Sequence, residues 1–478
     1  MRFFFKILIF ALIISSQIPA QVQFVKAKKK IELLSKERFF DRALLAVSAY
    51  DLTARKTIVN LNEKKLLHPA SNQKMITSAA ALLYLGEDYT FKTSFYYSGF
   101  VKDSVCYGDL YVKGGGDPDL TIDELDSLVA EIKNFGIRAV TGNLYGDVSF
   151  FDSTYWGEGW MWDDEPGISA PFLTPLIVND AGIKIYFAPT AVGSPPEITL
   201  EPEVDFFPIE NRALTIDADT SDLIITRGRM PHNNNIVIEG TLSKNSGVGY
   251  EEISIYKPEY FFLSLMKNAL VKNEIAFGGI TDTATLPQNA VELFTFERPV
   301  KNILPNMNKE SDNLSAEALF LLLGAEKFGA PANSEKSVKV IEQLINEIGL
   351  NPKDYRIADG SGLSHYNLVS TELMLNLLTY LYFNKPDIYE TFYNSLAIGG
   401  TDGTLSARMF AKEIMGNVRA KTGTLSGVSA LSGYLTAQGN HKIAFSIFIQ
   451  NFVEQYGTAR SYQDRICKIL SLMKREKK

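Results

Sequence analysis

Hydrophobic positions near the N-terminus predict a strand pair followed by a helix. The runs Leu44–Tyr50 and Thr57–Leu61 are rich in β-branched and other apolar residues and flank a polar turn, which is typical of a β-hairpin. The stretch "HPASNQKMITSAAALL" follows, with strong helix formers ahead of Gly86, a residue type that commonly ends a helix. We therefore expect a helix that begins at Ser71 and ends near Gly86.

The middle of the chain, from residue 87 to about residue 300, has a different pattern. Short β-rich runs alternate with clusters of glycine, proline and asparagine such as "KGGGDPDL" and "AVGSPPE". The predicted strands are Thr90–Tyr97, Gly108–Val112, Gly182–Phe187, Asp222–Thr226 and Ile236–Thr241. This region therefore predicts a long β-rich insert.

Helical spacing returns after residue 301. Apolar residues recur at intervals of three and four in Leu314–Lys327, Ser334–Ile348 and Thr371–Phe383, the pattern of amphipathic helices. Two strong strands joined at Gln438–His441 come next, and a terminal helix begins at about Gly457. The chain is therefore predicted to be an α/β protein interrupted by a β-rich insert.

Length and composition narrow the possible classes of protein. The 478 residues exceed one ordinary hydrophobic core, so about two to four domains are expected. With 46% hydrophobic and 12% aromatic residues the chain can bury large cores, which excludes global disorder. The formal net charge is −7 and no basic block is long enough to follow a phosphate backbone, so no nucleic acid partner is expected.

The first 20 residues have the pattern of an export signal. Arg2 and Lys6 precede or enter an apolar run that ends at Ile14, Pro19 follows, and Ala20 offers a small residue for cleavage. The run is too short for a comfortable membrane span. We expect cleavage near Ala20, an exported protein and no integral membrane span afterwards; a buried N-terminal core helix is the alternative.

Several common chemistries lack their sequence signatures. No Gly-x-Ser-x-Gly elbow occurs, and the four histidines have no supporting motif for a Ser-His-Asp triad. No His-Glu-x-x-His or other paired metal spacing is present, so neither a metal ion nor another cofactor is expected. The two cysteines, Cys106 and Cys467, are either two buried free thiols or one bridge, because sequence alone cannot place them close together.

Three short motifs occur in a specific order. A Ser-x-x-Lys tetrad, Ser71–Lys74, opens the predicted helix, where free backbone N–H groups favour developing negative charge. "SDN" at Ser311–Asn313 precedes another helix, and "KTGT" at Lys421–Thr424 contains the only Lys-Ser/Thr-Gly of the chain. Each motif alone also fits a structural role, in helix capping or in a turn before a strand. Their order together is much more specific than any single motif.

This order resembles the serine penicillin-binding protein and β-lactamase superfamily. The blocks "PASNQK", "KGGGDPDL", "SDNLSAEAL", "DGSGLS", "GGTDGTL" and "AKTGTLSGV" resemble one branch, the exported D-alanyl-D-alanine carboxypeptidase/endopeptidase family of low-molecular-mass penicillin-binding proteins, class C type. The similarity spans roughly residues 44–452. Between Lys74 and Ser311 lie 236 residues, which resembles the long insert of that family; compact β-lactamases lack it.

The resemblance implies a fold and a division into domains. A β-lactamase/transpeptidase-like domain, with an antiparallel sheet flanked by helices and a helical subdomain, is expected from residues 27–89 and 298–478. Inserted domain II is expected from residues 90–178 and 252–297, and inserted β-rich domain III from residues 179–251.

The resemblance also implies how the motif residues act. Ser71 would attack the penultimate carbonyl of a peptide ending in D-Ala-D-Ala and form an acyl-enzyme. Lys74 would take the serine proton, which requires a neutral amine, and burial next to a second cation, Lys421, favours that form. Ser311 would relay the proton to the leaving D-alanine, and Asn313 would hold the substrate amide and orient Lys74.

The third motif would recognise the terminal carboxylate of the substrate. Lys421, Thr422 and Thr424 would bind it, and the backbone N–H groups of Ser71 and Thr424 would form an oxyanion hole. Gly423 would let the substrate lie along the strand edge as an added strand. The implied partners are peptidoglycan stem peptides ending in D-Ala-D-Ala and, as covalent inhibitors, β-lactam antibiotics.

One position departs from the family pattern. After "DGSGLS" the family commonly carries arginine, whereas this chain has His365, so a charged third residue of the stem peptide would meet a weaker, pH-dependent partner. Asp147 in "YGDVSF" is a candidate contact for the amino group of that residue. An aspartate at a loop turn is the alternative.

The function predicted from the sequence is a periplasmic or cell-envelope serine-type D-Ala-D-Ala carboxypeptidase, with D,D-endopeptidase action on peptide cross-links as a further activity to test. Two alternatives remain open. A β-lactamase would need a dedicated base to activate water for fast deacylation, and the sequence offers no clear candidate for one. A non-catalytic peptidoglycan-binding protein would keep the fold but would not need the two lysines.

Overall fold

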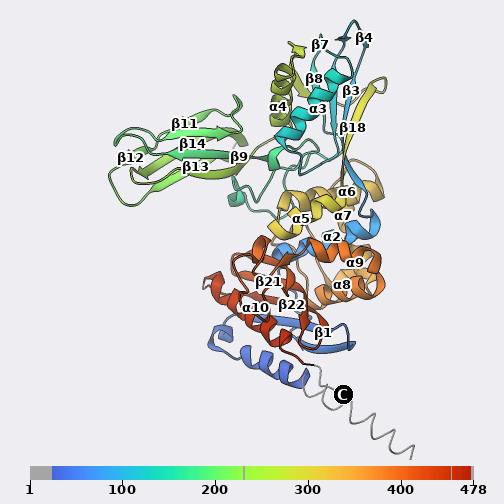
Figure 1. Cartoon of the computed structure of the whole chain (residues 1–478), viewed down its shortest axis with the longest axis vertical. Coiled ribbons are helices and arrows are strands. Elements are labelled where there is room, and N and C mark those ends of the chain that lie inside the picture. The colour runs from blue at the N-terminus through green and yellow to red at the C-terminus, as the bar shows by residue number, and fades with distance from the viewer. Residues whose placement is uncertain (1–23, 230–231, 454, 475–478) are drawn as a thin grey trace, which may run out of the picture. The chain divides into compact units, whose positions relative to one another are not determined.

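The computed structural model describes residues 24–229, 232–453 and 455–474, and Figure 1 shows the course of the chain. The chain divides into two compact units. Unit 1 combines Met1–Glu87, Leu304–Asp312 and Val338–Lys478, and unit 2 combines Asp88–Ile303 and Asn313–Ser337. The predicted export signal lies outside the described residues.

Unit 1 contains a six-stranded antiparallel sheet with the strand order β19-β20-β21-β22-β1-β2. The central strands β21 and β22 are buried on both faces, which explains why they form long apolar runs in the sequence. Both hairpins predicted from the sequence, β1–β2 and β21–β22, are confirmed. The strands are β1 (Leu44–Asp51), β2 (Lys56–Leu61), β19 (Ala397–Ile398), β20 (Arg419–Leu425), β21 (Val428–Ala437) and β22 (His441–Gln450).

Helices pack on this sheet. Alternate side chains of β22, among them Ile443, Phe445 and Ile447, point into one core, as the two-residue period of a strand requires. That core also contains residues of the terminal helix α10 and of the helix formed by residues 24–34. On β21, Tyr434 Oη donates to Leu378 O of α8 at 2.9 Å. The larger helices here are α2 (Gln73–Tyr84), α8 (Thr371–Asn384), α9 (Pro386–Ser395) and α10 (Tyr456–Ser471).

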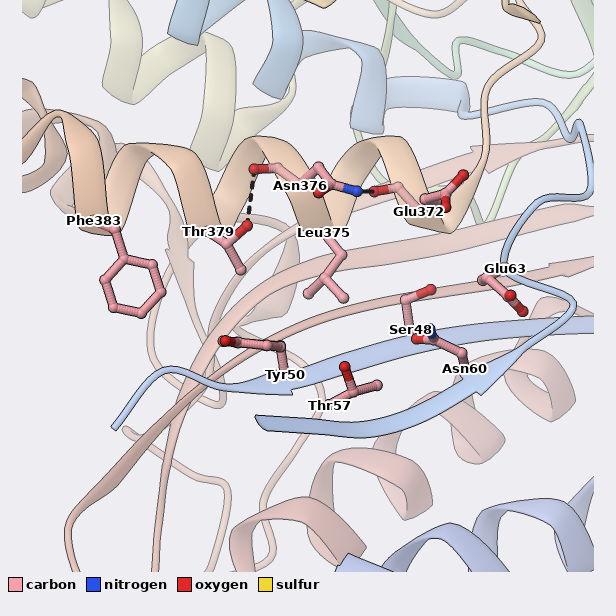
Figure 2. A pocket seen from close by; sticks show the side chains of 10 residues that line it. All are labelled: Ser48, Tyr50, Thr57, Asn60, Glu63, Glu372, Leu375, Asn376, Thr379 and Phe383. Carbon is pink, nitrogen blue, oxygen red and sulfur yellow. Dashed lines mark hydrogen bonds between the residues drawn. The ribbon is translucent and has the colours of Figure 1, made fainter. Parts of the chain in front are cut away.

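A polar pocket of about 340 Å³ lies between α8 and the strands β1 and β2 (Figure 2). Tyr50 and Phe383 stand toward one end, with ring centroids 6.5 Å apart, and Glu63 and Glu372 stand at the other end. None of the site residues predicted from the sequence lines this pocket. The β2 side of the sheet is therefore distinct from the predicted site.

Unit 2 is built from several small sheets. Their strand orders are β10-β9-β15, β11-β14-β12 with β13 also paired to β14, β16-β7-β5-β4, and β17-β8-β6-β3-β18. The strands are β3 (Thr90–Tyr97), β4 (Phe100–Lys102), β5 (Val105–Tyr107), β6 (Leu110–Gly114), β7 (Ala139–Val140), β8 (Leu144–Asp147), β9 (Gly182–Ala188), β10 (Glu197–Glu201), β11 (Ile209–Asn211), β12 (Leu214–Ile216), β13 (Asp222–Arg229), β14 (His232–Ser243), β15 (Gly249–Ser254), β16 (Ala276–Phe277), β17 (Thr281–Thr283) and β18 (Val291–Pro299). The β-rich character predicted for this region is present.

Two helices of this region were not identified from the sequence. The first, α3 (Ile122–Asn134), begins with a capping box in which Thr121 and Glu124 exchange hydrogen bonds. The second, α4 (Pro258–Lys272), has proline at its first position, where the missing N–H costs nothing. The remaining helices are α5 (Val300–Pro305), α6 (Asn313–Phe328) and α7 (Ser334–Glu347). The insert is thus a mixed α and β structure.

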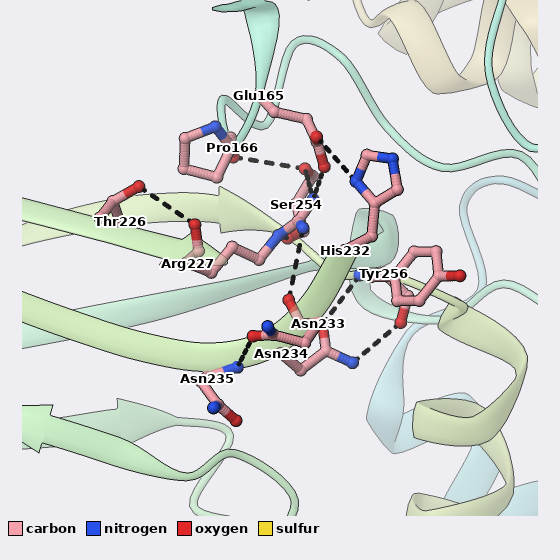
Figure 3. A network of polar contacts seen from close by, with 10 residues as sticks. All are labelled: Glu165, Pro166, Thr226, Arg227, His232, Asn233, Asn234, Asn235, Ser254 and Tyr256. Atoms are coloured by element: carbon pink, nitrogen blue, oxygen red, sulfur yellow. Dashed lines mark hydrogen bonds and ion pairs between the residues drawn. The ribbon is translucent and has the colours of Figure 1, made fainter. Parts of the chain in front are cut away.

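Unit 2 contains a buried ion pair (Figure 3). Arg227 on β13 places Nη2 2.7 Å from Glu165 Oε1, and the two side chains are only 1% and 3% exposed. Arg227 Nε also donates to Ser254 O at 2.7 Å, and His232 Nδ1 lies 3.0 Å from Glu165 Oε2. Because a buried charge without a partner is strongly destabilising, this guanidinium depends on its carboxylate.

Both cysteines are buried free thiols. Cys106 lies on β5 in unit 2, and Cys467 lies in α10 in unit 1. The structure therefore confirms the free-thiol alternative. Burial raises the pKa of Cys106 to about 11, so its thiol is unreactive near neutral pH.

In the part of the chain that the structure describes, no helix has both the length and the apolar character needed to cross a membrane.

Candidate active site

Ser71 lies in a short 3₁₀ turn, Ala70–Asn72, immediately before α2. The α-helix itself begins at Gln73, two residues later than the sequence predicts. Ala70 has a φ of 46°, a left-handed conformation that is costly for a residue with a Cβ atom and that recurs at functional sites. The side chain of Asn72 donates to Lys421 O at 3.0 Å, which attaches the turn to β20.

Lys74 is directed at the serine rather than at solvent. Its side chain is fully buried, and its Nζ donates to Ser71 Oγ at 3.0 Å and to Ser361 O at 2.9 Å. The i to i+3 spacing on one helical face brings the amine back to the turn. The pairing of Ser71 and Lys74 predicted from the sequence is therefore present in the structure.

The loop that supplies the Ser361 carbonyl is held by Asp359. The two carboxylate oxygens of Asp359 accept hydrogen bonds from the Gly362 and Ser364 backbone N–H groups at 2.8 and 2.6 Å. Gly362 has a φ of 86°, and a Cβ atom there would lie 1.8 Å from Ala70 O. This loop is the "DGSGLS" block, whose sequence suggested a family but not a contact with the lysine.

Ser311 and Lys421 form a second hydroxyl and amine pair. Lys421 is fully buried on β20, and its Nζ donates to Ser311 Oγ at 2.8 Å and to Thr422 O at 3.1 Å. Ser311 has a φ of 71° and follows a π-helical turn, Asn306–Glu310, a feature that is frequent at functional sites. The strained backbone directs this hydroxyl at the lysine.

Burial lowers the pKa of Lys421 well below its ordinary value. The nearby Lys74 cation lowers it further, and Glu310 opposes both effects. Desolvation disfavours the ammonium form, and a second positive charge disfavours it again. The site is therefore suited to hold a neutral amine next to a hydroxyl.

A buried network of hydrogen bonds reaches the backbone of Lys74, and the sequence did not predict it. Asn308 Nδ2 donates to Ser78 Oγ and to Ser395 Oγ, each at 2.9 Å. Ser78 Oγ in turn donates to Lys74 O at 2.7 Å. No short motif identifies these residues, because they come from three distant segments.

The strand β20 has an unpaired edge next to the site. One edge pairs with β21 along its whole length, whereas β19 covers only Ala420 and Arg419 on the other edge. No other described strand pairs with that edge between Lys421 and Leu425. Gly423 lies in this segment, and a Cβ atom there would lie 2.7 Å from Pro69 O. A side chain at position 423 would therefore push β20 away from the turn that carries Ser71, and the unpaired edge offers backbone groups to which an extended peptide can hydrogen-bond.

The two threonines of the third motif are oriented by different neighbours. Thr422 Oγ1 donates to Thr404 Oγ1 at 2.8 Å. Thr424 is exposed, and its Oγ1 accepts from Arg460 Nη2 at 3.4 Å. His365, the departure from the family pattern, is partly buried, with its ring centroid 5.4 Å from that of His68.

Asn313 and Asp147 belong to unit 2. Asn313 begins α6, two residues after Ser311, and its Nδ2 donates to Ser169 O at 2.6 Å. Asp147 ends β8 and is buried, and its oxygens accept from the backbone N–H groups of Ser149 and Leu286 at 2.9 and 2.8 Å. These bonds give Asp147 a structural role in a turn.

Comparisons with known proteins agree with this geometry. Residues 27–471 match the D-Ala-D-Ala carboxypeptidase 3 (S13) family. The D-alanyl-D-alanine carboxypeptidase DacB of Haemophilus influenzae is 30% identical over 412 residues, which cover 84% of this chain and 85% of that protein. The D-alanyl-D-alanine carboxypeptidase of Actinomadura sp. (strain R39) is 30% identical over 435 residues, which cover 88% and 80%.

A solved structure gives the same result for the fold. Penicillin binding protein 4 (dacB) from Haemophilus influenzae is similar with a TM-score of 0.83 and 26% identity, over 93% of this chain and 99% of that chain. The α/β fold class and the β-lactamase/transpeptidase-like resemblance are therefore confirmed. The chain belongs to the D-Ala-D-Ala carboxypeptidase 3 (S13) family.

Proposed function

We propose that Ser71 is the nucleophile of this chain, which by its family is a serine-type D-alanyl-D-alanine carboxypeptidase. One observation carries the proposal: two buried amines each meet a hydroxyl, Lys74 at Ser71 and Lys421 at Ser311. A serine is a weak nucleophile until a base takes its proton, and a neutral lysine amine is such a base. Burial of two amines close together disfavours a positive charge on both at once, so one of them is held neutral.

The reaction begins with acylation. Ser71 Oγ forms a bond to the carbonyl carbon of the penultimate D-alanine while its proton passes to Lys74 Nζ. The bond between that carbon and the nitrogen of the terminal D-alanine then breaks. The nitrogen receives the proton by way of Ser311 Oγ, so the terminal D-alanine leaves as an amine. Water afterwards hydrolyses the ester and restores Ser71.

The backbone N–H groups of Ser71 and Thr424 stabilise the oxyanion that forms on the carbonyl oxygen, and such a donor commonly contributes about 10²–10³ in rate. Lys421, Thr422 and Thr424 bind the terminal carboxylate. The unpaired edge of β20 supports this assignment, because an extended peptide can hydrogen-bond along it.

Three further residues complete the proposed site. Asn313 holds the substrate amide, as its place two residues after Ser311 in the "SDN" motif implies. His365 meets the third residue of the stem peptide with a charge that depends on pH. Asp147 binds an amino group of that residue. To do so, the substrate has to compete with the two backbone N–H groups that donate hydrogen bonds to the carboxylate oxygens of Asp147.

Release of D-alanine tests the proposal. The purified protein should release D-alanine from a peptide ending in D-Ala-D-Ala, and Ser71→Ala should reduce the rate by at least about 10³-fold, as for other catalytic serines. Mass spectrometry of cross-linked cell-wall fragments would reveal endopeptidase action as cleavage of a dimer rather than loss of one alanine. Binding of fragments without any product would favour a non-catalytic protein instead.

Nitrocefin separates this enzyme from a β-lactamase. A carboxypeptidase of this type should give a stoichiometric burst, because its acyl-enzyme with a β-lactam lacks a dedicated base for hydrolysis. Sustained turnover of nitrocefin would contradict the assignment.

We also propose that the protein is exported to the periplasm or cell envelope, where peptidoglycan is located. The apolar run near the N-terminus supports this location. N-terminal sequencing of the protein recovered from the periplasmic fraction should begin near Gln21. Recovery only from the cytosol, with the first 20 residues retained, would contradict it.

A further inference from the structure

A second cavity of unit 1 adjoins β20. It has a volume of about 300 Å³ and is lined by residues of the segment 404–408 and of the first half of α10. Thr404 in its wall accepts a hydrogen bond from Thr422, and Arg460 in its wall donates to Thr424. Neither threonine lines the cavity itself, but two of its wall residues hydrogen-bond to the threonines that the proposed function assigns to the terminal carboxylate. Any role of the cavity in substrate recognition rests on that proposed function.

The two arginines of this cavity have different surroundings. Arg408 Nη2 lies 2.5 Å from Asp464 Oδ1 and 3.1 Å from Gln463 Oε1, so its charge is balanced. Arg460 has no Asp or Glu oxygen within 4 Å among the described residues. Arg460 is exposed, and partial desolvation together with the neighbouring Arg408 cation lowers its pKa from the ordinary value, although the group remains charged near neutral pH.

An anion would relieve this excess of positive charge. The cavity wall contains two guanidinium groups and one carboxylate, that of Asp464. Charge-assisted hydrogen bonds from arginine to a carboxylate are among the stronger polar contacts in proteins. The charge of the cavity therefore favours a ligand with a carboxylate in addition to the one that the threonines bind.

The volume of the cavity points to a leaving residue larger than D-alanine. The side chain of D-alanine is one methyl group, which needs roughly the volume of a water molecule, about 30 Å³. A cavity of about 300 Å³ next to the carboxylate-binding threonines leaves most of its space unused by that methyl group.

We propose that this cavity is a subsite for the side chain of the leaving residue, and that it accepts a D-amino acid whose side chain carries an anionic group bound by Arg460. The substrate class is a peptide in which the scissile D-alanine is followed by such a residue rather than by D-alanine alone. Arg460 is a specificity residue here, and the bond that breaks is the same as in the proposed function.

Three peptides test the subsite. They share one acyl part up to the scissile D-alanine and end in D-alanine, D-glutamate or D-glutamine, and kcat/KM is measured by chromatography of the released amino acid. For the wild type, the D-glutamate peptide should exceed the D-glutamine peptide about tenfold. Arg460→Gln should remove that preference while changing the D-alanine peptide by less than about threefold, and Arg460→Lys should keep part of the preference.

Two further variants serve as controls on charge and on volume. Arg465 lies on the same helix as Arg460, and its guanidinium is 2.5 Å from a carboxylate oxygen of Glu37. Arg465→Gln removes this guanidinium and should leave kcat/KM for all three peptides unchanged. Ala407→Phe places a ring in the cavity from an exposed position, and it should slow the D-glutamate and D-glutamine peptides more than the D-alanine peptide.

Two results would overturn the subsite while the proposed function stands. One is equal kcat/KM of the wild type for all three peptides. The other is an equal loss for all three in Arg460→Gln, since that variant would then act on the terminal carboxylate that they share. A wild type that releases no amino acid from any peptide and forms no adduct with penicillin would instead refute the proposed function, and the subsite with it.

Discussion

Each unit of the molecule buries a basic side chain, and the two side chains have different surroundings. Arg227 in unit 2 lies 2.7 Å from a carboxylate oxygen of Glu165. Lys421 in unit 1 is also fully buried, yet among the described residues no Asp or Glu oxygen lies within 4 Å of its Nζ. Its neighbours are the hydroxyl of Ser311 and the carbonyl of Thr422.

The difference shows how burial can serve either stability or chemistry. A buried guanidinium cannot lose its proton, so it requires a partner of opposite charge. A buried lysine can lose its proton, and burial lowers the pKa of Lys421 well below its ordinary value, which favours the neutral amine there. Perturbed groups of this kind cluster at functional sites. Substitutions in the two units can test that distinction.

The largest effect is expected from Lys421→Met. Removal of the amine that donates to Ser311, the proposed relay hydroxyl, should lower kcat/KM for D-alanine release by about 10²–10⁴, the usual contribution of assisted proton transfer. The melting temperature should stay the same or rise, because methionine has no charge to desolvate. Activity within tenfold of the wild type, or a loss explained by unfolding, would remove the chemical role of Lys421.

Glu165→Gln in unit 2 is expected to lower stability, whereas Lys421→Met is expected to lower activity. The guanidinium of Arg227 would stay buried without its carboxylate, and unfolding of this region should become easier by about 3–5 kcal/mol. Hydrogen exchange of β13 and β14, followed by mass spectrometry, measures the effect. The double variant Glu165→Gln/Arg227→Met should recover part of the loss. Unchanged exchange in the single variant would contradict the role of the ion pair.

An intermediate effect is expected from Gly423→Ala, which tests the close packing of β20 against the turn that carries Ser71 rather than the effect of a charge. The new Cβ atom would lie 2.7 Å from Pro69 O, so β20 and the turn that carries Ser71 must separate. We expect a stability loss of about 1–3 kcal/mol and slower acylation by penicillin. Gly278→Ala, with nothing within 4 Å of the new atom, is the matched control and should change neither. Equal behaviour of the two variants would show that the contact is unimportant.

The pH dependence of stability gives a smaller and graded effect. Because Lys421 has a lowered pKa in the folded state, the unfolded chain binds more protons between that pKa and the unfolded value of about 10.4. The free energy of unfolding should therefore rise with pH across that window, by at most about 1.4 kcal/mol per pH unit. Urea unfolding at several pH values should show this slope in the wild type. In Lys421→Met, the contribution of Lys421 to the slope should be absent.

The smallest effect is expected at His365, which is partly exposed. His365→Ala should change KM by less than about fivefold for a substrate with an anionic third residue, because exposed charge pairs contribute about 1 kcal/mol or less. The change should be larger at pH 6 than at pH 8, since histidine is charged at the lower value. An equal effect at both pH values would show that its charge is not involved.

Much of unit 1 could be predicted from the sequence because its signals are local. The strands β1, β2, β21 and β22 and the helix α8 follow clear periods of two or of three to four residues. In unit 2 the helices α3 and α4 were missed, because the neighbouring glycine and proline clusters suggested turns and strands throughout. The exact start of α2 was also misplaced, since a 3₁₀ turn at Ser71 has the same residue preferences as a helix start.

The sequence predicted the motif side chains of the site, but it did not predict the backbone and side-chain groups that hold them in place. Ser71, Lys74, Ser311 and Lys421 carry recognisable motifs, and the structure brings each lysine to its serine. The Ser361 carbonyl that also accepts from Lys74 has no signature, because the orientation of a backbone carbonyl depends on tertiary structure. The same reason applies to the network around Asn308 and to the left-handed backbone at Ala70.

The most direct test of the account is the position of the penicillin adduct. The protein is incubated with benzylpenicillin near neutral pH, digested, and analysed by mass spectrometry. The account predicts one adduct with the mass of the intact drug on the peptide that contains Ser71, and no adduct in Ser71→Ala. An adduct on another residue, or one that persists in Ser71→Ala, would contradict it.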